Sequence, residues 1–338
     1  LIEIPLAIVD GAGDIVAMSP STHDLGLTKN LRFVSSEVRK IVERVRATGR
    51  PAERELELTR GPLGGTTINL SLRADRFGAN FVLVVIADKT EMRRLDDVRR
   101  DFVANISHEL KTPIGAVTLL AEALNSAADD PDTVRHFAER LSDEAERLAT
   151  LTREIIDLSR LQAEDGLEPF ELIDLNDIVA TAVDHTQVGA RARGLEIVVG
   201  STDKATVKGD SARLIMAVSN LITNAITYSV PPGKIGVGVT HSGDFVEIAV
   251  SDRGIGMTVE ETERVFERFY RTDQARSRST GGTGLGLSIV KHIVNHHGGD
   301  IRVWSRPNRG STFTLRFPYV RPASAKEKAK EIEKEKVA

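Results

Sequence analysis

Residues 281–290 read GGTGLGLSIV, in which three alternate glycines lead directly into an apolar helical pattern. Gly282, Gly284 and Gly286 leave backbone N–H groups uncovered where that helix begins, at the positive end of its dipole. Such an arrangement can bind phosphate. Because flexible glycine loops also occur without a ligand, this interpretation depends on what the rest of the chain carries.

Two other stretches of the same region have features that suit a nucleotide. Asn220 and Asn224 in NLITNAITYS share one helix face, where amide oxygens can bind a hard cation together with phosphates. Asp252 in SDRGIGM follows an apolar strand and precedes Gly254 and Gly256, which permit close approach by a ligand. Its carboxylate can accept a hydrogen bond from an exocyclic amine. Taken singly, surface asparagines and a simple turn are the alternatives.

The run FERFYR lies between these stretches and the glycine loop. Phe266, Phe269 and Tyr270 are most simply core or lid packing. Arg268 or Arg271 could meet a phosphate, because guanidinium groups form strong charge-assisted hydrogen bonds with phosphate oxygens. Alone, the run indicates packing rather than binding.

In chain order, the asparagine pair, Asp-x-Gly-x-Gly, FERF and Gly-x-Gly-x-Gly resemble the N, G1, F and G2 boxes of the GHKL ATP-binding fold. The resemblance implies an ATP site formed by Asn220, Asn224, Tyr228, Asp252, Gly254, Gly256, Arg271, Gly282, Thr283, Gly284, Leu285 and Gly286. It also implies that Asn224 holds Mg²⁺. The glycine loop follows the apolar strand by about thirty residues and lacks Gly-Lys-Ser/Thr, so neither a dinucleotide fingerprint nor a phosphate loop fits.

A further motif, SHELKTPIG, places His108 and Glu109 on a helical stretch far upstream. A neutral imidazole is a competent nucleophile near pH 7, and an adjacent carboxylate can accept or orient its ring proton. An exposed helix histidine without a role is the alternative, and the ATP boxes decide against it. With them, the motif resembles the H box of sensor histidine kinases, a resemblance that covers nearly the whole chain.

The same resemblance extends to the residues after His108. Glu109 and Thr112 match the family's Glu-x-x-Thr pattern, which implies that Thr112 positions water for dephosphorylating a partner response regulator. Pro113 removes a helix hydrogen bond, and we expect it to bend the helix there. Both activities would then depend on one turn of helix.

One position departs from the family pattern. Many members have a lysine before the aromatic residue of the N box, whereas this chain has Thr227 before Tyr228. Arg271, Arg276 or Arg278 could supply the missing cation, and Tyr228 keeps the aromatic face that resembles the family's adenine-stacking position. Three stretches of the sequence are most similar to the actinobacterial phosphate-responsive branch of these kinases: FVANISHELKTP, NLITNAITYS and ERFYR.

The first part of the chain has the pattern of a small sheet domain. Residues 4–18 place two apolar strands around the turn signal DGAGD, which predicts a hairpin. Residues 35–47 have helical spacing, and the runs ERELEL, TTINLSLRA and NFVLVVIAD predict three strands ending near Asp88. Only His23 could be considered as a haem ligand in residues 1–88, and we interpret it as a surface loop residue. The ligand of this domain stays unknown.

From Lys89 the pattern predicts a helical hairpin. A break at residues 125–131 separates two helices, and Asp132 is the expected cap of the second. The second helix carries a narrow apolar seam: Phe137, Leu141, Leu148, Leu151, Ile155 and Leu158. Two helices alone cannot bury two seams, so we infer a homodimer that forms a four-helix bundle.

These patterns predict a multidomain α+β protein: a PAS-like sensor domain, a helical hairpin that forms a dimeric four-helix bundle, and an α/β sandwich GHKL ATP-binding domain. In the ATP-binding domain we expect helices at 175–192, 210–227, near 260–270 and at 285–297, with strands between them. The predicted boundaries are 1–88 for the sensor domain, 89–100 for a signalling helix linker, 101–165 for the phosphotransfer hairpin, 168–320 for the catalytic domain and 321–338 for a charged tail.

Composition excludes several other classes. The 338 residues carry a net charge of −4 without a basic stripe, which argues against direct nucleic-acid binding. The absence of cysteine excludes a disulfide scaffold and a thiolate zinc site. No apolar run approaches the roughly 20 residues that span a bilayer. The resemblance implies a cytoplasmic fragment whose full-length protein has a membrane anchor upstream of residue 1.

The resemblance therefore implies an ATP-dependent protein-histidine kinase that phosphorylates His108 and passes the phosphoryl group to an aspartate of a cognate response regulator. A sensor scaffold that binds ATP without transfer is one alternative, which the intact His-Glu and Asn pairs disfavour. Another GHKL enzyme, such as a serine kinase or an ATPase, is a second alternative, and such enzymes lack the H box.

Overall fold

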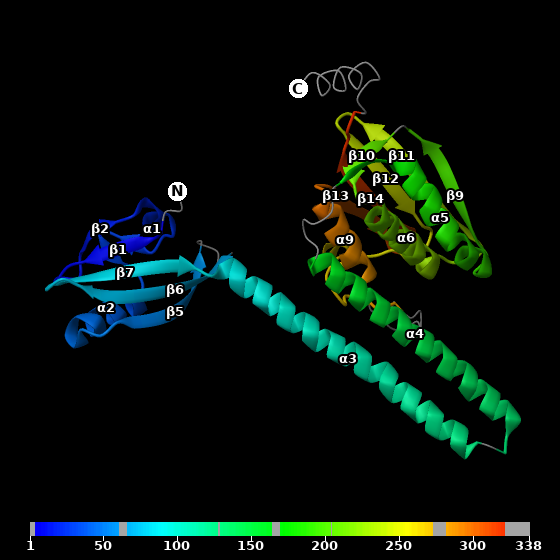
Figure 1. Ribbon diagram of the computed structural model, residues 1–338, viewed down its shortest axis with the longest axis horizontal. Helices are drawn as coiled ribbons and strands as arrows, with labels where there is room; N and C mark the ends of the chain where they lie inside the picture. Colours follow the sequence, from blue (N-terminus) through cyan, green and yellow to red (C-terminus); the bar gives the residue numbers. More distant parts are fainter. Residues whose placement is uncertain are drawn as a thin grey trace, which may run out of the picture. The chain divides into compact units, whose positions relative to one another are not determined.

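The computed structural model describes residues 4–60, 66–127, 129–163, 170–203, 205–272 and 282–321. It divides into two compact units, Leu1–Ala104 and Asn105–Ala338, with the division inside helix α3, Thr90–Ser126 (Figure 1). None of the described helices is long and apolar enough to cross a membrane. Each unit is built around its own sheet.

The first unit is a five-stranded antiparallel sheet of order β2-β1-β7-β6-β5. Its elements are β1 Leu6–Val9, β2 Ile15–Met18, α1 Pro20–Asp24, β3 Thr28–Lys29, β4 Arg32–Phe33, α2 Ser36–Thr48, β5 Ala52–Arg60, β6 Thr66–Phe77 and β7 Phe81–Asp88. The predicted hairpin, helix and three strands are confirmed, whereas α1, β3 and β4 were not predicted. Helix α2 buries Val38, Ile41, Val42 and Val45 in the core of the sheet, as its spacing requires.

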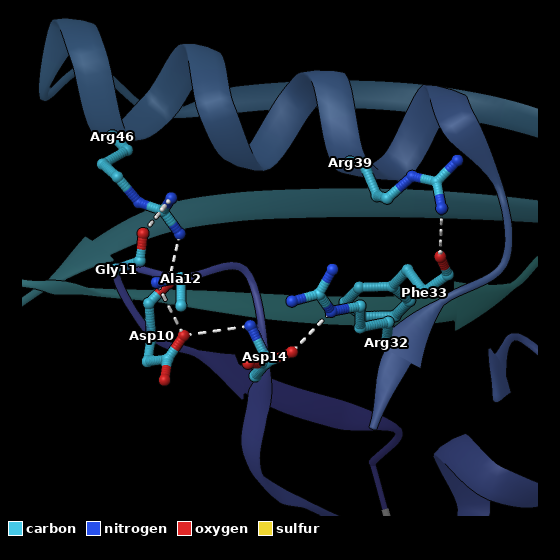
Figure 2. A network of polar contacts seen from close by, with 8 residues as sticks. All are labelled: Asp10, Gly11, Ala12, Asp14, Arg32, Phe33, Arg39 and Arg46. Carbon is cyan, nitrogen blue, oxygen red and sulfur yellow. Dashed lines mark hydrogen bonds and ion pairs between the residues drawn. The ribbon is translucent and has the colours of Figure 1, made fainter. Parts of the chain in front are cut away.

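The turn between β1 and β2 is tied to helix α2 (Figure 2). The Oδ1 atom of Asp10 accepts hydrogen bonds from the backbone N–H groups of Ala12 and Asp14, each at 2.9 Å. Arg46 reaches from α2 and donates to the backbone carbonyls of Asp10 and Gly11. Figure 2 also shows Arg32 paired with Asp14 and Arg39 donating to the carbonyl of Phe33. His23 is exposed on α1, as a surface residue, although it lies in a helix rather than a loop.

The second unit contains the helical hairpin and an α/β domain. After α3 come α4 Pro131–Ala163, β8 Glu171–Asp174, α5 Leu175–Ala192, β9 Leu195–Thr202, β10 Thr206–Gly209, α6 Ser211–Tyr228, β11 Gly233–Ser242, β12 Phe245–Ser251, α7 Val259–Arg264, α9 Gly286–His296, β13 Asp300–Arg306 and β14 Gly310–Pro318. The main sheet has the order β13-β14-β12-β11-β9, and only its β11–β9 pair is parallel. Helices α5, α6 and α9 cover one face of this sheet (Figure 1).

Two sequence expectations for this unit need correction. Asp130, not Asp132, caps α4: its Oδ1 atom accepts from the backbone N–H of Thr133 at 3.3 Å, and Pro131 then fits the first helical position. Helix α7 ends at Arg264 rather than near residue 270, and the chain beyond it is not helical at Phe269, which has a positive φ of 61°. The short sheet β8–β10 was not predicted. Helix α3 continues through Pro113, and its expected bend stays a prediction.

The apolar face of α4 differs from the predicted seam. Leu151 and Leu158 are buried, as is Leu161, which the prediction omitted. These residues follow at steps of seven and three, so they share one side of the helix. Helix α4 packs against α9, and the ring of His292 on α9 lies 3.2 Å from the carbonyl oxygen of Leu161. Part of the face expected to serve a dimer is thus buried within a single chain.

The C-terminal end of α9 holds a buried histidine that bridges two helices. The Nδ1 atom of His297 lies 2.7 Å from the carbonyl oxygen of Ile293, and its Nε2 atom accepts the backbone N–H of Asp210 at 3.0 Å. The Phe170 ring stacks on it at a centroid distance of 4.8 Å. Both ring nitrogens are therefore used by the neutral tautomer protonated at Nδ1.

We expect His297 to make the stability of this domain depend on pH. Burial lowers the pKa of the His297 imidazole, and the neighbouring His296 and Arg213 charges act in the same direction, against Asp210 and the Ile293 carbonyl. As the pH falls, the imidazole is therefore protonated in the unfolded chain before it is protonated in the folded chain. The contribution of His297 to the free energy of unfolding is fully present above pH ~6.5 and decreases as the pH drops toward the lowered pKa of the folded state. Each pH unit in that window costs at most about 1.4 kcal/mol.

Urea unfolding followed through Trp304, the single tryptophan and part of strand β13, measures this effect. His297→Gln should flatten the pH dependence below about pH 6.5, because glutamine can accept the same N–H without titrating. His185→Gln, at an exposed position of α5, is the control and should keep the slope. An unchanged slope in His297→Gln would contradict the assignment.

Candidate functional site

Helix α6 brings the asparagine pair to a cavity because its other face is buried. The side chain of Asp210 caps the helix by accepting from the backbone N–H of Arg213 at 3.0 Å. Leucine, isoleucine, valine and alanine side chains from Leu214 to Ile226 fill the interface with the sheet. Asn220, Asn224 and Tyr228 follow at steps of four and remain on the free side. All three line one cavity.

This cavity, of about 150 Å³, collects most of the predicted ATP-site residues. Its lining includes Asn220, Asn224, Tyr228, Asp252, Gly256, Arg271, Gly282, Thr283, Gly284 and Gly286. Two predicted residues, Gly254 and Leu285, are not in the lining. Gly254 pairs with Ser229 beside it, and Leu285 is fully buried at the start of α9. Four separate stretches of sequence therefore meet at one place.

Asp252 lies at the end of strand β12 with its carboxylate in the cavity wall. Its Oδ1 atom accepts the backbone N–H groups of Gly254 at 2.7 Å and Ser311 at 3.3 Å. Burial raises the pKa of the Asp252 carboxyl, while these two hydrogen bonds oppose the rise. Because both bonds use Oδ1, the Oδ2 atom is the one left to meet a ligand.

The glycines after Asp252 lie close to neighbouring backbone. A Cβ at Gly254 would lie 2.2 Å from the carbonyl oxygen of Tyr228, and one at Gly256 only 1.9 Å from that of Arg306. Gly256 also has a positive φ of 63°. Both glycines therefore allow close approach of neighbouring backbone, and Gly256 also lines the cavity. They shape the wall in which Asp252 is held.

The glycine loop is held by the FERF stretch. The backbone N–H of Phe269 donates to the carbonyl of Gly284 at 2.9 Å, and a Cβ at Gly284 would lie 2.8 Å from the Cα atom of Phe269. Gly284 has a φ of 76°, which favours glycine. The backbone N–H of Leu285 donates to the Thr283 hydroxyl at 3.3 Å. The loop thus enters α9 in a defined conformation.

Aromatic and basic groups also line the cavity. Tyr270 and Arg271 are in the lining, and the guanidinium of Arg264 lies 4.4 Å from the centre of the Tyr270 ring. Burial raises the pKa of the Tyr228 phenol although the charge of Arg271 opposes it, so Tyr228 stays protonated at neutral pH. Phe266 packs edge-on against the Phe313 ring at 6.3 Å. These positions combine core packing with contact to the cavity.

The position that departs from the family pattern, Thr227, also lines the cavity. Its hydroxyl donates to the carbonyl of Thr223 at 2.8 Å, within α6, so it adds no charge. Arg271 does bring a cation to the lining. Arg276 and Arg278, the other candidates, lie outside the described residues.

Sequence reasoning missed several lining residues. They are Glu154, Thr223, Ile255, Met257, Val265, Thr272, Leu287, Ser311 and Phe313. Most are close in sequence to a predicted box or belong to a strand facing the cavity. Glu154 is different, because it comes from α4, outside the α/β domain. An acidic residue on the same helix face as Leu151 and Leu158 was the signal that could have found it.

His108 lies on α3 with its side chain exposed, and Glu109 beside it is half-buried. The hydroxyl of Thr112, one turn later, donates to the backbone carbonyl of His108 at 3.4 Å. The His108 and Thr112 side chains therefore share one helix face, accessible to another molecule or domain.

The residues of the cavity fit a magnesium ion only together with a nucleotide. Among the described residues, no group of three or more histidines and carboxylates is placed to hold a metal. The cavity instead offers the amides of Asn220 and Asn224. Mg²⁺ commonly takes one or two protein ligands and completes its shell with phosphates and water. This donor set suits such an ion.

Comparisons with known proteins agree with this geometry. Residues 98–164 match the "His Kinase A (phospho-acceptor) domain", and residues 209–321 match the "Histidine kinase-, DNA gyrase B-, and HSP90-like ATPase" family. The "Sensor-like histidine kinase SenX3" of Mycolicibacterium smegmatis is 42% identical, over 93% of this chain and 82% of the relative. The "Phosphate regulon sensor protein PhoR" of Pseudomonas aeruginosa is 32% identical, over 78% and 59%.

A solved structure also shares the fold. The crystal structure of histidine kinase ThkA in complex with response regulator protein TrrA matches 94% of this chain and 96% of that chain. Its TM-score is 0.53 at 22% sequence identity. The likeness concerns the arrangement of helices and strands.

Proposed function

The chain belongs to the two-component sensor histidine kinases, and from that premise we propose that it transfers the γ-phosphoryl group of ATP to His108. The observation that carries the assignment of the ATP site is the meeting of Asn224, Asp252 and the glycine loop in one cavity. The response regulator is the partner that two-component membership implies, and its aspartate receives the group from His108.

Each part of the cavity has a role in holding ATP. The Asp252 carboxylate accepts a hydrogen bond from the exocyclic amine of adenine, and the Tyr228 ring stacks on the base. The loop from Gly282 to Gly286 receives the phosphates at the N-terminus of α9, where Arg271 adds positive charge. Asn224, with Asn220 beside it, would hold Mg²⁺ together with the phosphates, and the ion would supply charge neutralisation.

The transfer itself needs little covalent chemistry from the protein. A neutral ring nitrogen of His108 attacks the γ-phosphorus, the new N–P bond forms, and the bond to the β,γ-bridging oxygen breaks so that ADP leaves. The second ring nitrogen keeps its proton, and Glu109 orients and stabilises that N–H as positive charge develops. The exposed His108 side chain suits a phosphoacceptor that must meet both a nucleotide and a regulator.

Thr112 supports a second activity. Its hydroxyl lies one turn from His108 on the same exposed face, and we assign it to positioning the water that dephosphorylates the regulator. His108 would then serve phosphoryl transfer, and Thr112 would serve the hydrolysis that removes the phosphoryl group from the regulator. Loss of phosphatase activity with retained kinase activity in Thr112→Ala tests this role.

We also propose that two copies of the chain associate through the helical hairpin. Ile114 and Leu119 on α3 and Ile156 on α4 are 52%, 67% and 45% exposed, so the single helical hairpin leaves these large apolar residues uncovered. A second hairpin would cover them in a four-helix bundle. Sedimentation as a monomer at micromolar concentration would contradict this dimer.

The domain boundaries follow the same proposal. Residues 1–88 form a PAS-like sensor domain, 89–100 a signalling linker, 101–165 the dimerising hairpin, 168–320 the catalytic domain, and 321–338 a tail. An antiparallel sheet with α2 packed on it supports the sensor assignment. The similarity to SenX3 and PhoR supports the phosphate-responsive branch. Nucleotide binding by residues 168–320 alone tests the catalytic boundary.

Base selection is the sharpest test of the ATP site. Guanine has a carbonyl where adenine has its amine, so GTP would place an acceptor against the Asp252 carboxylate and leave a buried group unpaired. That loss corresponds to about 5- to 150-fold weaker binding. Labelling from [γ-³²P]GTP should therefore be weak beside labelling from [γ-³²P]ATP, and the product should be acid-labile.

Asp252→Asn should weaken ATP binding by about tenfold, because the amide still accepts through its oxygen but loses the charge. Asp244→Asn, at an exposed position of the same domain, is the matched control and should bind ATP normally. Equal labelling of the unmodified protein by both nucleotides would show that Asp252 does not read the base.

A further inference from the structure

Helix α4 places an acidic side chain at the phosphate end of the nucleotide cavity. Glu154 follows Leu151 by three residues and precedes Leu158 by four, so it lies on the buried face of the helix. It is in the lining of the cavity, together with Asn220 and Gly284. The three leucines of this face are at most 4% exposed, which shows that α4 is closely packed here.

The Glu154 carboxylate uses a donor of the glycine loop. The hydroxyl of Thr283 donates to the Oε2 atom of Glu154, and the backbone N–H of Leu285 donates to the same hydroxyl at 3.3 Å. Thr283 is itself only 6% exposed. A chain of donors from the start of α9 therefore ends on an acidic oxygen. That oxygen lies beside the N-terminus of α9, where an anion is favoured.

Both partners of the contact between Glu154 and Thr283 are fixed by neighbouring structure. On the loop side, Phe269 fixes the backbone of Gly284. On the helix side, Leu158 and Leu161 are buried, and α4 packs against α9. Glu154 is thus placed by packing over the whole face of α4, not by a single hydrogen bond.

We propose that Glu154 is an autoinhibitory residue: with α4 packed on α9, its carboxylate occupies the phosphate end of the cavity and opposes the triphosphate of ATP. This inference rests on the proposed nucleotide site and adds a regulatory element to it. Like charges close together in a partly buried site repel strongly. ATP and the docked carboxylate therefore exclude one another.

The arrangement is suited to being reversed. Burial raises the pKa of the Glu154 carboxyl, and the Thr283 hydroxyl opposes that rise only in part. Holding the group in the cavity therefore costs free energy, which withdrawal of α4 recovers. The two equilibria are linked: ATP binding weakens the packing of α4 on α9 by the same factor by which release of α4 strengthens ATP binding. Such coupling factors are typically about 5- to 150-fold.

The test measures the dissociation constant of AMP-PNP with Mg²⁺ for the whole chain and three variants. Glu154→Gln keeps the size of the side chain and a hydrogen bond to Thr283 but removes the charge. Glu154→Ala removes both. Glu139→Gln, at an exposed position earlier on α4, removes the same charge away from the cavity. Adenosine, which has no phosphate, is measured in parallel, and Trp304 fluorescence shows that each variant is folded.

Glu154→Gln and Glu154→Ala should bind AMP-PNP about tenfold more tightly or better, with adenosine affinity and the Glu139→Gln control unchanged. Unchanged or weaker AMP-PNP binding in both Glu154 variants would overturn the inference, as would an equal gain for adenosine. If neither the unmodified chain nor any variant bound AMP-PNP, the assignment of the nucleotide site itself would be wrong. If the unmodified chain and the Glu154 variants bound AMP-PNP with equal, measurable affinity, only the role of Glu154 would be rejected.

Discussion

His108→Gln removes all phosphorylation from ATP while leaving nucleotide affinity within about twofold. The side chain is exposed on α3 and has no place in the cavity lining, so its loss leaves the ATP site intact. Glutamine retains a similar length and polarity but offers no nucleophilic ring nitrogen. Incorporation of label should fall by at least about a thousandfold, because no other group can take over the covalent step.

Two controls accompany the measurement with [γ-³²P]ATP. Thr112→Ala, one turn away on the same face, should keep its label and lose only activity toward the phosphorylated regulator. His136→Gln, at an exposed position on α4, should behave as the unmodified chain. Label that persists in His108→Gln would place the acceptor at another residue.

Asn224→Ala is expected to have the second largest effect, a loss of about 100-fold in autophosphorylation. The amide of Asn224 is the group assigned to Mg²⁺, and an ion bridging phosphates carries much of the charge neutralisation in phosphoryl transfer. Alanine cannot bind the ion and leaves the phosphates less well compensated. Asn295→Ala, at an exposed position of α9, is the matched control.

The metal dependence separates this role from a structural one. Binding of ADP in the presence of EDTA should be similar for the unmodified chain and Asn224→Ala, whereas addition of Mg²⁺ should strengthen binding mainly in the unmodified chain. Asn224→Asp should also change the Mg²⁺ dependence, because its charge alters the ion site. Equal Mg²⁺ responses in all three proteins would rule out Asn224 as the ligand.

The elements of the α/β domain could be predicted where local pattern and packing agree. Helix α6 keeps one face for the core and the other for Asn220 and Asn224, so its periodicity alone placed the pair correctly. The ends of elements were harder. Helix α7 is followed by Phe269, which has a left-handed backbone and donates a hydrogen bond to the carbonyl of Gly284, far along the chain. No local signal in FERFYR contains that partner.

The site shows the same limit. Asp252 was predicted to face a ligand, and it lines the cavity, but the glycines after it make room for the backbone of Tyr228 and Arg306. A sequence motif can identify a site residue, but it does not show which distant residues pack around it. Glu154 could not be found from the boxes, because its place in the cavity depends on how α4 packs against another part of the unit.

The position of the phosphoryl group in the unmodified chain tests the central claim most directly. Trypsin should release residues 101–111, DFVANISHELK, in which His108 is the only histidine and Ser107 the only hydroxyl residue. After incubation with ATP and Mg²⁺, mass spectrometry under neutral conditions should find one phosphoryl group on this peptide, lost on brief acid treatment and stable in alkali. An acid-stable group on Ser107, or a phosphorylated peptide that lacks His108, would contradict the account.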